Sequence, residues 1–284
     1  MITPTYEWQF APQVEDADFT KIAKKAGLGP EVARLLFERG IQNEESLKKF
    51  LEPSLEDLHD PYLLHDMDKA VERIRQAIEE GENILVYGDY DADGMTSASI
   101  VKESLEQLGA ECRVYLPNRF TDGYGPNASV YKYFIEQEGI SLIVTVDNGV
   151  AGHEAIELAQ SMGVDVIVTD HHSMPETLPD AYAIVHPEHP DADYPFKYLA
   201  GCGVAFKLAC ALLEEVQVEL LDLVAIGTIA DMVSLTDENR IMVQYGLEML
   251  GHTQRIGLQE LLDMAGIAAN EVTEETVGFQ IAPR

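Results

Sequence analysis

The sequence has few cysteines, few basic residues and no long apolar run. Its three cysteines, Cys112, Cys202 and Cys210, share no metal-ligand spacing, so we interpret them as reduced structural thiols. No window approaches the roughly 18 to 20 apolar residues that a membrane helix needs. The first residues, M-I-T-P-T-Y-E-W, lack the basic-then-apolar order of a signal peptide. We therefore expect a cytoplasmic protein with no membrane partner.

Basic residues are scarce relative to acidic ones. The chain has 19 Lys and Arg against 50 Asp and Glu, which gives a net charge of −31 over 284 residues. This balance argues against a broad nucleic-acid surface, because binding to phosphates normally uses Lys and Arg. It favours solubility and the binding of cations. The apolar fraction of 46% is normal for a globular protein of one large domain or two smaller ones.

The N-terminal part of the chain is predicted to be helical. Apolar residues recur at helical spacing in three segments, and Gly or Pro ends each of them. We expect a small helical segment over residues 1–62, a turn-rich link near its end, and an amphipathic helix over 67–80 that leads into the first strand. The three helical segments are 19–27, 30–40 and 44–51.

From residue 84 onward, strand and helix patterns alternate. This alternation predicts an α/β fold, with a doubly wound, mostly parallel β-sheet and helices on both of its faces. After Pro195 the pattern becomes helical, most clearly over 201–216 and 220–230. The predicted strands are 84–87, 112–116, 141–146 and 165–169, and the predicted helices between them are 96–108, 128–138 and 153–162.

Three carboxylates follow the first predicted strand in the run I-L-V-Y-G-D-Y-D-A-D-G. If the chain stays extended, Asp89, Asp91 and Asp93 point to the same side. Like charges held together repel one another, and a divalent cation resolves that conflict. The alternative is a solvated acidic loop, with Gly94 making the turn in either case.

Two further predicted strands also end in polar clusters. One runs into Asp147 and Asn148, and another into Asp170, His171 and His172. Ligands of open parallel sheets gather beyond the carboxyl ends of the strands, so we expect the three clusters to meet at one edge. Oxygen ligands with one or two imidazoles suit Mn²⁺ or Mg²⁺ better than structural zinc. Several carboxylates together indicate two metals, which in hydrolases activate water for attack on a phosphoester.

Two candidates carry a structural alternative. His171 and His172 could both reach the site from a turn beyond a strand, or they could belong to a solvated turn. Asp231 ends the apolar helical run L-L-D-L-V-A-I-G-T-I-A-D and could be a metal ligand or an ordinary cap residue. The residues alone leave both questions open.

Together these segments resemble a known family. The runs D-Y-D-A-D-G, V-D-N-G, D-H-H and G-T-I-A-D-M are similar to the four motifs of the DHH phosphoesterases. Three other runs resemble its branch of single-strand-specific 5′→3′ DNA exonucleases: D-P-Y-L-L-H-D-M-D-K-A, Y-L-P-N-R-F-T-D-G-Y-G-P-N and L-A-G-C-G-V-A-F-K-L. The resemblance implies a hydrolase of DNA repair and recombination that uses two Mn²⁺ or Mg²⁺ ions and releases 5′-mononucleotides.

The resemblance also implies roles for individual residues. Asp147 would bridge the two metals. Tyr87 stands where other branches carry a ligand histidine, and Asp89 could substitute for that histidine, although it is a weaker candidate than the core ligands. His172 would lie near the scissile phosphate, while Asp170 and Asn148 would support the ligands. The implied core ligands are Asp91, Asp93, Asp147, His171 and Asp231, and the implied catalytic set adds His172.

A loop before the second half of the sheet resembles the family's nucleic-acid-contacting segment. Arg119 could pair with a phosphate through its planar fork, or it could merely pair with a local acid. Tyr124 could stack on a base or hydrogen-bond the backbone of the strand. The residues of this loop that we expect to bind substrate are Asn118, Arg119 and Tyr124.

The resemblance suggests a domain organisation and partners. Residues 63–284 would form the catalytic domain, and the second domain that closes over the substrate groove in relatives would be absent, so we expect this chain to be weakly active or inactive. The implied partners are single-stranded DNA, a single-strand-binding protein and a helicase. We expect the protein itself to be a monomer. Two other functions stay open: hydrolysis of oligonucleotides or cyclic dinucleotides, and a non-catalytic scaffold for replication and repair proteins.

Overall fold

The computed structural model describes residues 16–284, so the first 15 residues of the expected N-terminal segment lie outside the described part. The chain divides into two compact units, one ending at Ser54 and the other beginning at Leu55. The sequence prediction places the division at residue 62. Leu55 and Leu58 pack against the core of the larger unit, and the His59 amide donates to Glu238 there over 2.8 Å.

The smaller unit consists of three helices. They are α1 (Ala17–Lys25), α2 (Pro30–Glu38) and α3 (Glu44–Leu51). The side chains of Asp16 and Asn43 cap the first and third helices by accepting backbone amides, as short polar residues do at such positions. Phe19, Leu36 and Leu47 bury their side chains between the helices.

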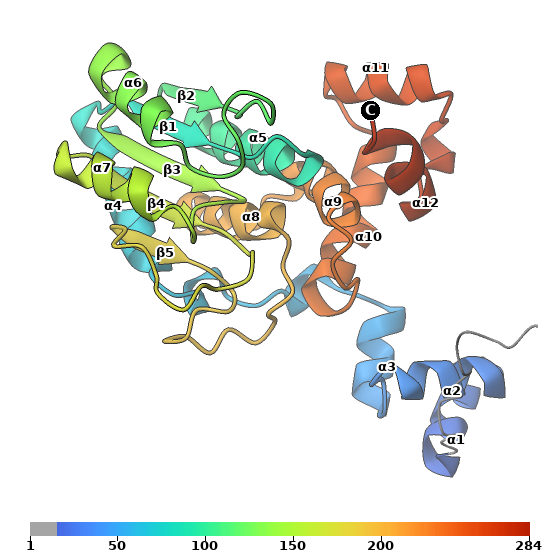
Figure 1. Ribbon diagram of the computed structural model, residues 1–284. Helices are drawn as coiled ribbons and strands as arrows, with labels where there is room; N and C mark the ends of the chain where they lie inside the picture. Colours follow the sequence, from blue (N-terminus) through green and yellow to red (C-terminus); the bar gives the residue numbers. More distant parts are fainter. Residues whose placement is uncertain (1–15) are drawn as a thin grey trace, which may run out of the picture. The chain divides into compact units, whose positions relative to one another are not determined.

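The larger unit is built on a parallel sheet of five strands in the order β2-β1-β3-β4-β5 (Figure 1). The doubly wound sheet predicted from the sequence is confirmed. The last strand was not predicted, because three residues at the sheet edge give too short an apolar run to stand out. The strands are β1 (Ile84–Tyr87), β2 (Cys112–Tyr115), β3 (Leu142–Val146), β4 (Asp165–Thr169) and β5 (Ala183–Val185).

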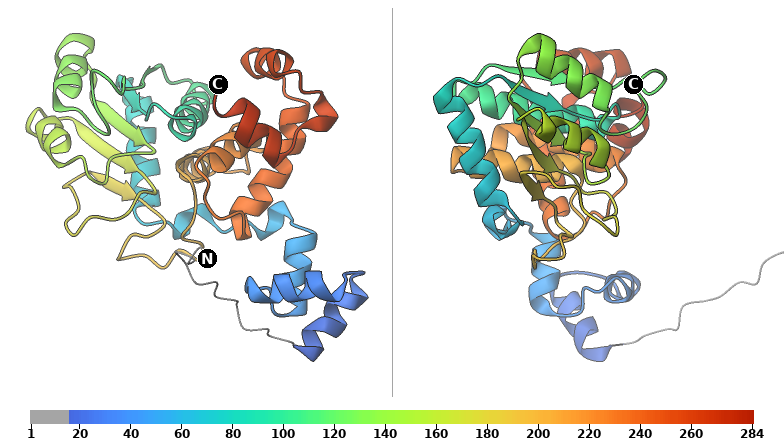
Figure 2. Two further views of the ribbon diagram at one scale, coloured as in Figure 1. Left: turned by 45° about the vertical axis from the view of Figure 1, so that its right-hand side comes forward. Right: turned by 60° about the vertical axis from the view of Figure 1, so that its left-hand side comes forward.

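Helices cover both faces of the sheet (Figure 2). On one face α6 (Ala128–Glu138) and α7 (His153–Ser161) pack against Leu85, Ile143 and other strand side chains. The opposite face, with Val86 and Val144, packs against three helices. Alternate strand residues therefore enter different cores, as the pleat requires. These three helices are α4 (Met67–Glu80), α5 (Ala92–Gln107) and α8 (Gly201–Leu213).

The C-terminal part of the chain is helical and packs beside α5 and α8, as Figure 1 shows. Helices α9 and α10 cross at close range, because Gly246 of α10 lies directly against α9. A short irregular helix, Val277–Ile281, lies near the end of the chain, and the first and last residues of this helix are buried. The helices are α9 (Leu221–Ala230), α10 (Asp237–Gly251), α11 (Ile256–Ala265) and α12 (Glu274–Thr276), with short 3₁₀ turns at Leu55–Asp57, Pro61–Leu63, Val218–Leu220 and Ala269–Glu271.

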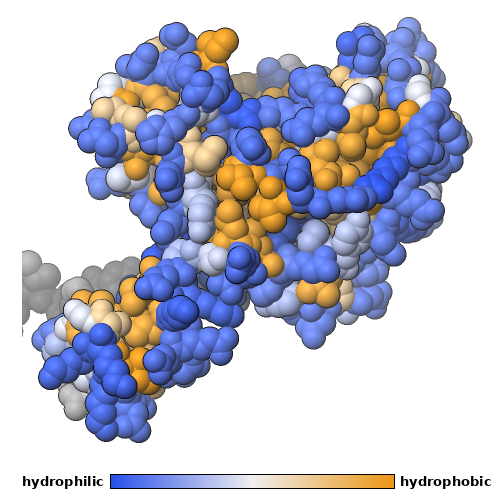
Figure 3. All heavy atoms as spheres, turned by 180° about the vertical axis from the view of Figure 1, so that it is seen from behind, coloured by the Kyte–Doolittle hydropathy of each residue, from blue (hydrophilic) through white to orange (hydrophobic). Residues whose placement is uncertain are grey.

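On the face opposite to the one seen in Figure 1, hydrophilic residues cover most of the surface, and hydrophobic residues are exposed in patches (Figure 3). Within residues 16–284, none of the helices has both the length and the apolar character to cross a membrane.

We predict that Gly246→Ala destabilises the larger unit by about 1–3 kcal/mol, the usual cost of overpacking. A methyl group at this position would lie 2.6 Å from the Ala225 Cβ and even nearer the carbonyl of Leu221. Gly257 of α11 has open space around it, so Gly257→Ala should be neutral or stabilising by up to about 1 kcal/mol. Urea unfolding of both variants measures their free energies of unfolding. Equal changes in the two variants would contradict the close packing of Gly246 against α9.

Candidate metal centre

The carboxylates that follow β1 lie at the start of α5. Helix α5 begins at Ala92, four residues before the predicted start at 96, and Asp91 is its N-cap, accepting the Gly94 amide over 2.9 Å. The expectation that Asp89, Asp91 and Asp93 alternate along an extended chain is therefore wrong. Gly94 does not make the turn as expected; it lies in the helix and is required because a Cβ there would approach the Asp89 amide nitrogen to 2.6 Å.

Asp93 is held by the N-terminus of α8. Its two carboxylate oxygens accept the amides of Gly201, over 2.7 Å, and Cys202, over 2.9 Å. A helix N-terminus favours negative charge, so these amides suit a carboxylate that is only 1% exposed. The same approach places Gly201 so close to Asp147 that a Cβ would lie 2.6 Å from the Asp147 Cβ.

Asp147 and Asn148 follow β3 at the centre of the sheet. Asp147 has a left-handed backbone, with φ of 60°, and its amide donates to the Thr169 carbonyl at the end of β4. The Asn148 side chain donates to the carbonyls of Val146 and Tyr87, which ties the ends of β3 and β1 together. Asn148 therefore holds the strand ends beneath the centre.

Asp170 organises the turn that follows β4. One of its oxygens accepts the amides of His171 and His172 and also the Nδ1 of His172 over 2.8 Å. The other oxygen accepts the Val150 amide from the neighbouring loop. This buried carboxylate thus fixes both the turn and the orientation of the His172 ring.

The side chains from these segments converge on His171. Its Nε2 lies 3.1 Å from an oxygen of Asp147, 3.6 Å from one of Asp93 and 3.7 Å from one of Asp231. The Asp147 and His171 atoms are close but out of line for a hydrogen bond, and both are buried without a partner. An imidazole nitrogen and a carboxylate oxygen that face one space in this way fit a shared cation.

The potential ligand atoms form overlapping groups in which neighbouring atoms lie within 4.8 Å. One group contains Asp93, His171 and Asp231, and another contains Asp89, Asp91 and Asp147. Asp147 and His171 also meet His172 in a third group, so Asp147 borders both halves of the cluster. The structure therefore brings together all seven residues that the sequence nominated as ligands or catalytic groups.

Burial and mutual repulsion disfavour the charged form of Asp89, Asp147 and Asp231. Burial raises the pKa of Asp147 far above its ordinary value, and the nearby Asp93 and Asp91 raise it further. Burial, and after it the nearby charge of Asp93, raises the pKa of Asp231 to about 6, although His171 opposes the shift. The pKa of Asp89 is raised too, chiefly by burial. A bound cation would reverse this balance.

The loop that was expected to contact substrate reaches the centre through Tyr124. Its hydroxyl lies 2.8 Å from the Nε2 of His172, so Tyr124 pairs with this histidine. Arg119 lies over the ring of Tyr90, 4.9 Å from its centre, and Tyr90 contacts Tyr124 edge-on. The Asn118 side chain instead accepts the Phe120 amide within its own loop.

Two glycines in the wall of the centre were not predicted to have a role. A Cβ at Gly227 of α9 would lie 2.7 Å from an Asp93 oxygen and 2.6 Å from the Cys202 sulfur. Asp147 leaves no room for a side chain at Gly201. Their signal was present in the runs L-A-G-C-G-V and A-I-G-T-I-A-D, but only the fold reveals what each glycine faces.

Comparison with known proteins identifies this arrangement. Residues 83–228 match the DHH family, N-terminal domain. The chain belongs to the DHH family. This confirms the resemblance noted from the motifs.

Several relatives within the DHH family carry one name. The chain is 48% identical to the single-stranded-DNA-specific exonuclease RecJ of Bacillus subtilis, covering all of this chain and 36% of that protein. It is 40% identical to RecJ of Escherichia coli, covering 91% of this chain and 47% of the relative. The crystal structure of RecJ from Thermus thermophilus in complex with Mn²⁺ matches with a TM-score of 0.77 and 33% identity, over 94% of this chain and 38% of that one. The chain thus spans between a third and a half of these three relatives.

We predict that Asp170→Asn lowers the pKa of His172. The hydrogen bond from His172 to Asp170 holds that pKa above its ordinary value, even though burial opposes the shift. The stabilisation from this pair is present in full below the unfolded-state pKa of about 6.5 and is lost as the pH rises through the raised folded-state pKa. The variant should therefore be destabilised more at pH 6 than at pH 9.

NMR titration of the metal-free protein and of the Asp170→Asn variant measures the pKa of His172 in each. The exposed His252 provides an internal control and should titrate identically in both proteins. An unchanged His172 titration would show that Asp170 does not govern the charge of that ring.

Proposed function

We propose that this chain forms the metal-binding catalytic part of a single-strand-specific DNA exonuclease that hydrolyses phosphodiester bonds from the 5′ end. The observation that carries the proposal is the convergence of Asp93, Asp147, His171 and Asp231, in which two buried atoms face each other without a hydrogen-bond partner. The relatives' name supplies the substrate class.

The residues present suit Mn²⁺ or Mg²⁺. The donors are carboxylate oxygens with one or two imidazoles, and the chain's cysteines do not belong to the groups of potential ligands. One cation would be held by Asp93, His171 and Asp231, and the other by Asp89 and Asp91, with Asp147 between the two. When bound, such cations supply a nucleophilic hydroxide and stabilise the charge on the phosphate oxygens.

His172 is placed to act on the substrate. Asp170 and Tyr124 hold its ring from both nitrogens, and Asp170 raises its pKa, which favours the protonated form. A partly exposed imidazolium beside a carboxylate cluster can attract and orient a phosphate. Because it lies at the rim, His172 gives the strongly acidic chain a local positive charge where a phosphate would arrive.

The neighbouring aromatic residues suit a single strand. Tyr90, Tyr124 and the exposed Phe120 lie in or beside the loop that carries Arg119. Aromatic rings stack on unpaired bases without regard to sequence, and an arginine can pair with the backbone. A narrow contact of this kind needs no broad basic surface. Action in the cytoplasm as a monomer, with a single-strand-binding protein and a helicase as partners, stays a prediction.

We predict that Asp147→Asn lowers the affinity for Mn²⁺ by at least about 100-fold, since changes even behind the ligands of metal sites cost about 10–100-fold. Calorimetric titration of the chelator-treated chain with Mn²⁺ measures this. Glu157→Gln, which removes the same charge from the exposed face of α7, is the matched control and should bind as the unaltered chain does. Equal binding by all three proteins would rule out Asp147 as a ligand.

We predict Mn²⁺-dependent release of mononucleotides from the 5′ end of single-stranded DNA, slower than by the longer RecJ of Bacillus subtilis assayed in parallel. Strands labelled at either end define the direction, and a duplex, a dinucleotide and a cyclic dinucleotide define the substrate. Asp147→Asn should abolish the activity. Faster cleavage of either dinucleotide would favour the oligonucleotide or cyclic-dinucleotide function instead. Cleavage of none of the substrates by a chain that also binds no Mn²⁺, while RecJ remains active, would contradict the proposal.

A further inference from the structure

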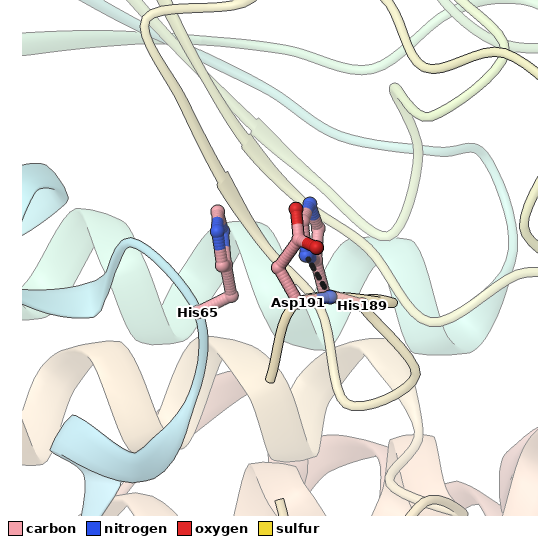
Figure 4. Close-up of side chains that lie close together, drawn as sticks. All are labelled: His65, His189 and Asp191. Carbon is pink, nitrogen blue, oxygen red and sulfur yellow. Dashed lines mark hydrogen bonds between the residues drawn. The ribbon is translucent and has the colours of Figure 1, made fainter. Parts of the chain in front are cut away.

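A second cluster of histidines lies outside the catalytic centre. His65, in the turn before α4, and His189, in the loop after β5, come from distant parts of the sequence. Their rings are stacked with centroids 3.5 Å apart and planes within 10° of parallel. The side chain of Asp191 lies beside His189 (Figure 4). One potential ligand atom from each of the three residues lies within 4.8 Å of the others.

The contacts of His65 leave one ring nitrogen available. Its Nδ1 faces the carbonyl of Ile184 over 3.3 Å and a carboxylate oxygen of Asp66 over 3.4 Å. Both neighbours are acceptors, so in the neutral ring Nδ1 carries the proton and Nε2 has the lone pair.

His189 is also suited to bind a cation. It is almost fully buried, and burial, with His65 adding to it, lowers its pKa. The neutral imidazole is the form that binds metals. Its Nδ1 accepts the Asp191 amide over 3.2 Å, so this nitrogen carries the lone pair, and a cation bound there would replace this long hydrogen bond.

The carboxylate of Asp191 supplies an oxygen to the same place. The Asp191 side chain is exposed and can adjust its position. Other acidic residues around the pair are Asp66, which is held by the Ile184 amide, and Glu188, whose amide is bonded to His186. The surroundings therefore favour a cation.

We propose that His65, His189 and Asp191 form a binding site for a transition-metal cation of the zinc type, separate from the catalytic centre. Two imidazole nitrogens and one carboxylate oxygen are a ligand set that zinc accepts, with water completing the shell. A metal lies near the plane of each imidazole that binds it, so two parallel rings cannot both coordinate as they stand. Binding therefore requires the partly exposed His65 ring to turn out of the stack and away from its present Nδ1 contacts.

The bound cation would stabilise the turn that carries His171 and His172. The loop that holds His189 also holds His186, whose Nε2 donates to the His172 carbonyl over 2.8 Å. His186 keeps this donor because its Nδ1 accepts the Glu188 amide. A cation that joins this loop to the turn before α4 would therefore fix a segment that supports the catalytic turn, without contacting the substrate.

Zinc titration of the chelator-treated chain tests the proposal. Zn²⁺ alone should shift the side-chain ¹⁵N resonances of His65 and His189 and raise the melting temperature by several degrees when in excess. His65→Asn keeps a donor at the position of Nδ1 but has no equivalent of Nε2. Calorimetry should therefore find one fewer Zn²⁺ per chain in this variant than in the unaltered chain, whatever the catalytic centre binds.

His153→Asn is the matched control, since it removes an exposed histidine at the start of α7 and should leave the number of bound Zn²⁺ ions unchanged. If His65→Asn fails to fold, Asp191→Asn provides the same test from an exposed position and should weaken Zn²⁺ binding at this site by at least tenfold. Equal stoichiometry and affinity in all the variants, with unmoved His65 and His189 resonances, would overturn the proposal.

Discussion

The candidate centre depends on the contact between the N-terminus of α8 and the carboxylate of Asp93. Two backbone amides bind this buried carboxylate, and they do so only because Gly201 lets the helix approach. The same contact presses α8 against Asp147, while Gly227 lets α9 approach Asp93 from another side. The positions of the carboxylates are thus set by helix packing and not by the acidic loop alone.

Without a cation this arrangement is electrostatically unfavourable. Burial and repulsion raise the pKa of Asp147 and Asp231, and Asp231 lies at the C-terminal end of α9, where negative charge is disfavoured. The left-handed backbone at Asp147 costs on the order of 1–3 kcal/mol. The surrounding structure therefore holds the ligands in place before a cation arrives, which suits a site whose positions must be accurate for catalysis.

Much of this could be predicted from the sequence, because apolar periodicity marks strands and helices and parallel strands bring their carboxyl ends to one edge. The first four strands, and the meeting of the acidic residues that follow three of them, were predicted correctly. The start of α5 was predicted incorrectly. Asp91 is its N-cap and Asp93 lies in its first turn, but the same alternating acidic residues are also typical of an extended loop. The roles of Gly201 and Gly227 and the pairing of Tyr124 with His172 depend on which helices and loops approach each other, and local sequence does not encode that.

The most direct test of the two-metal centre is a crystal structure of the protein grown with Mn²⁺, with anomalous data collected at the manganese edge. We expect anomalous peaks among Asp93, Asp147, His171 and Asp231 and on the Asp89 side of Asp147, with Asp147 contacting both. Ligand distances would then replace the unpartnered contact between the Asp147 and His171 atoms. A cluster that holds no manganese, with these side chains bonded only to one another, would contradict a metal centre at this edge of the sheet.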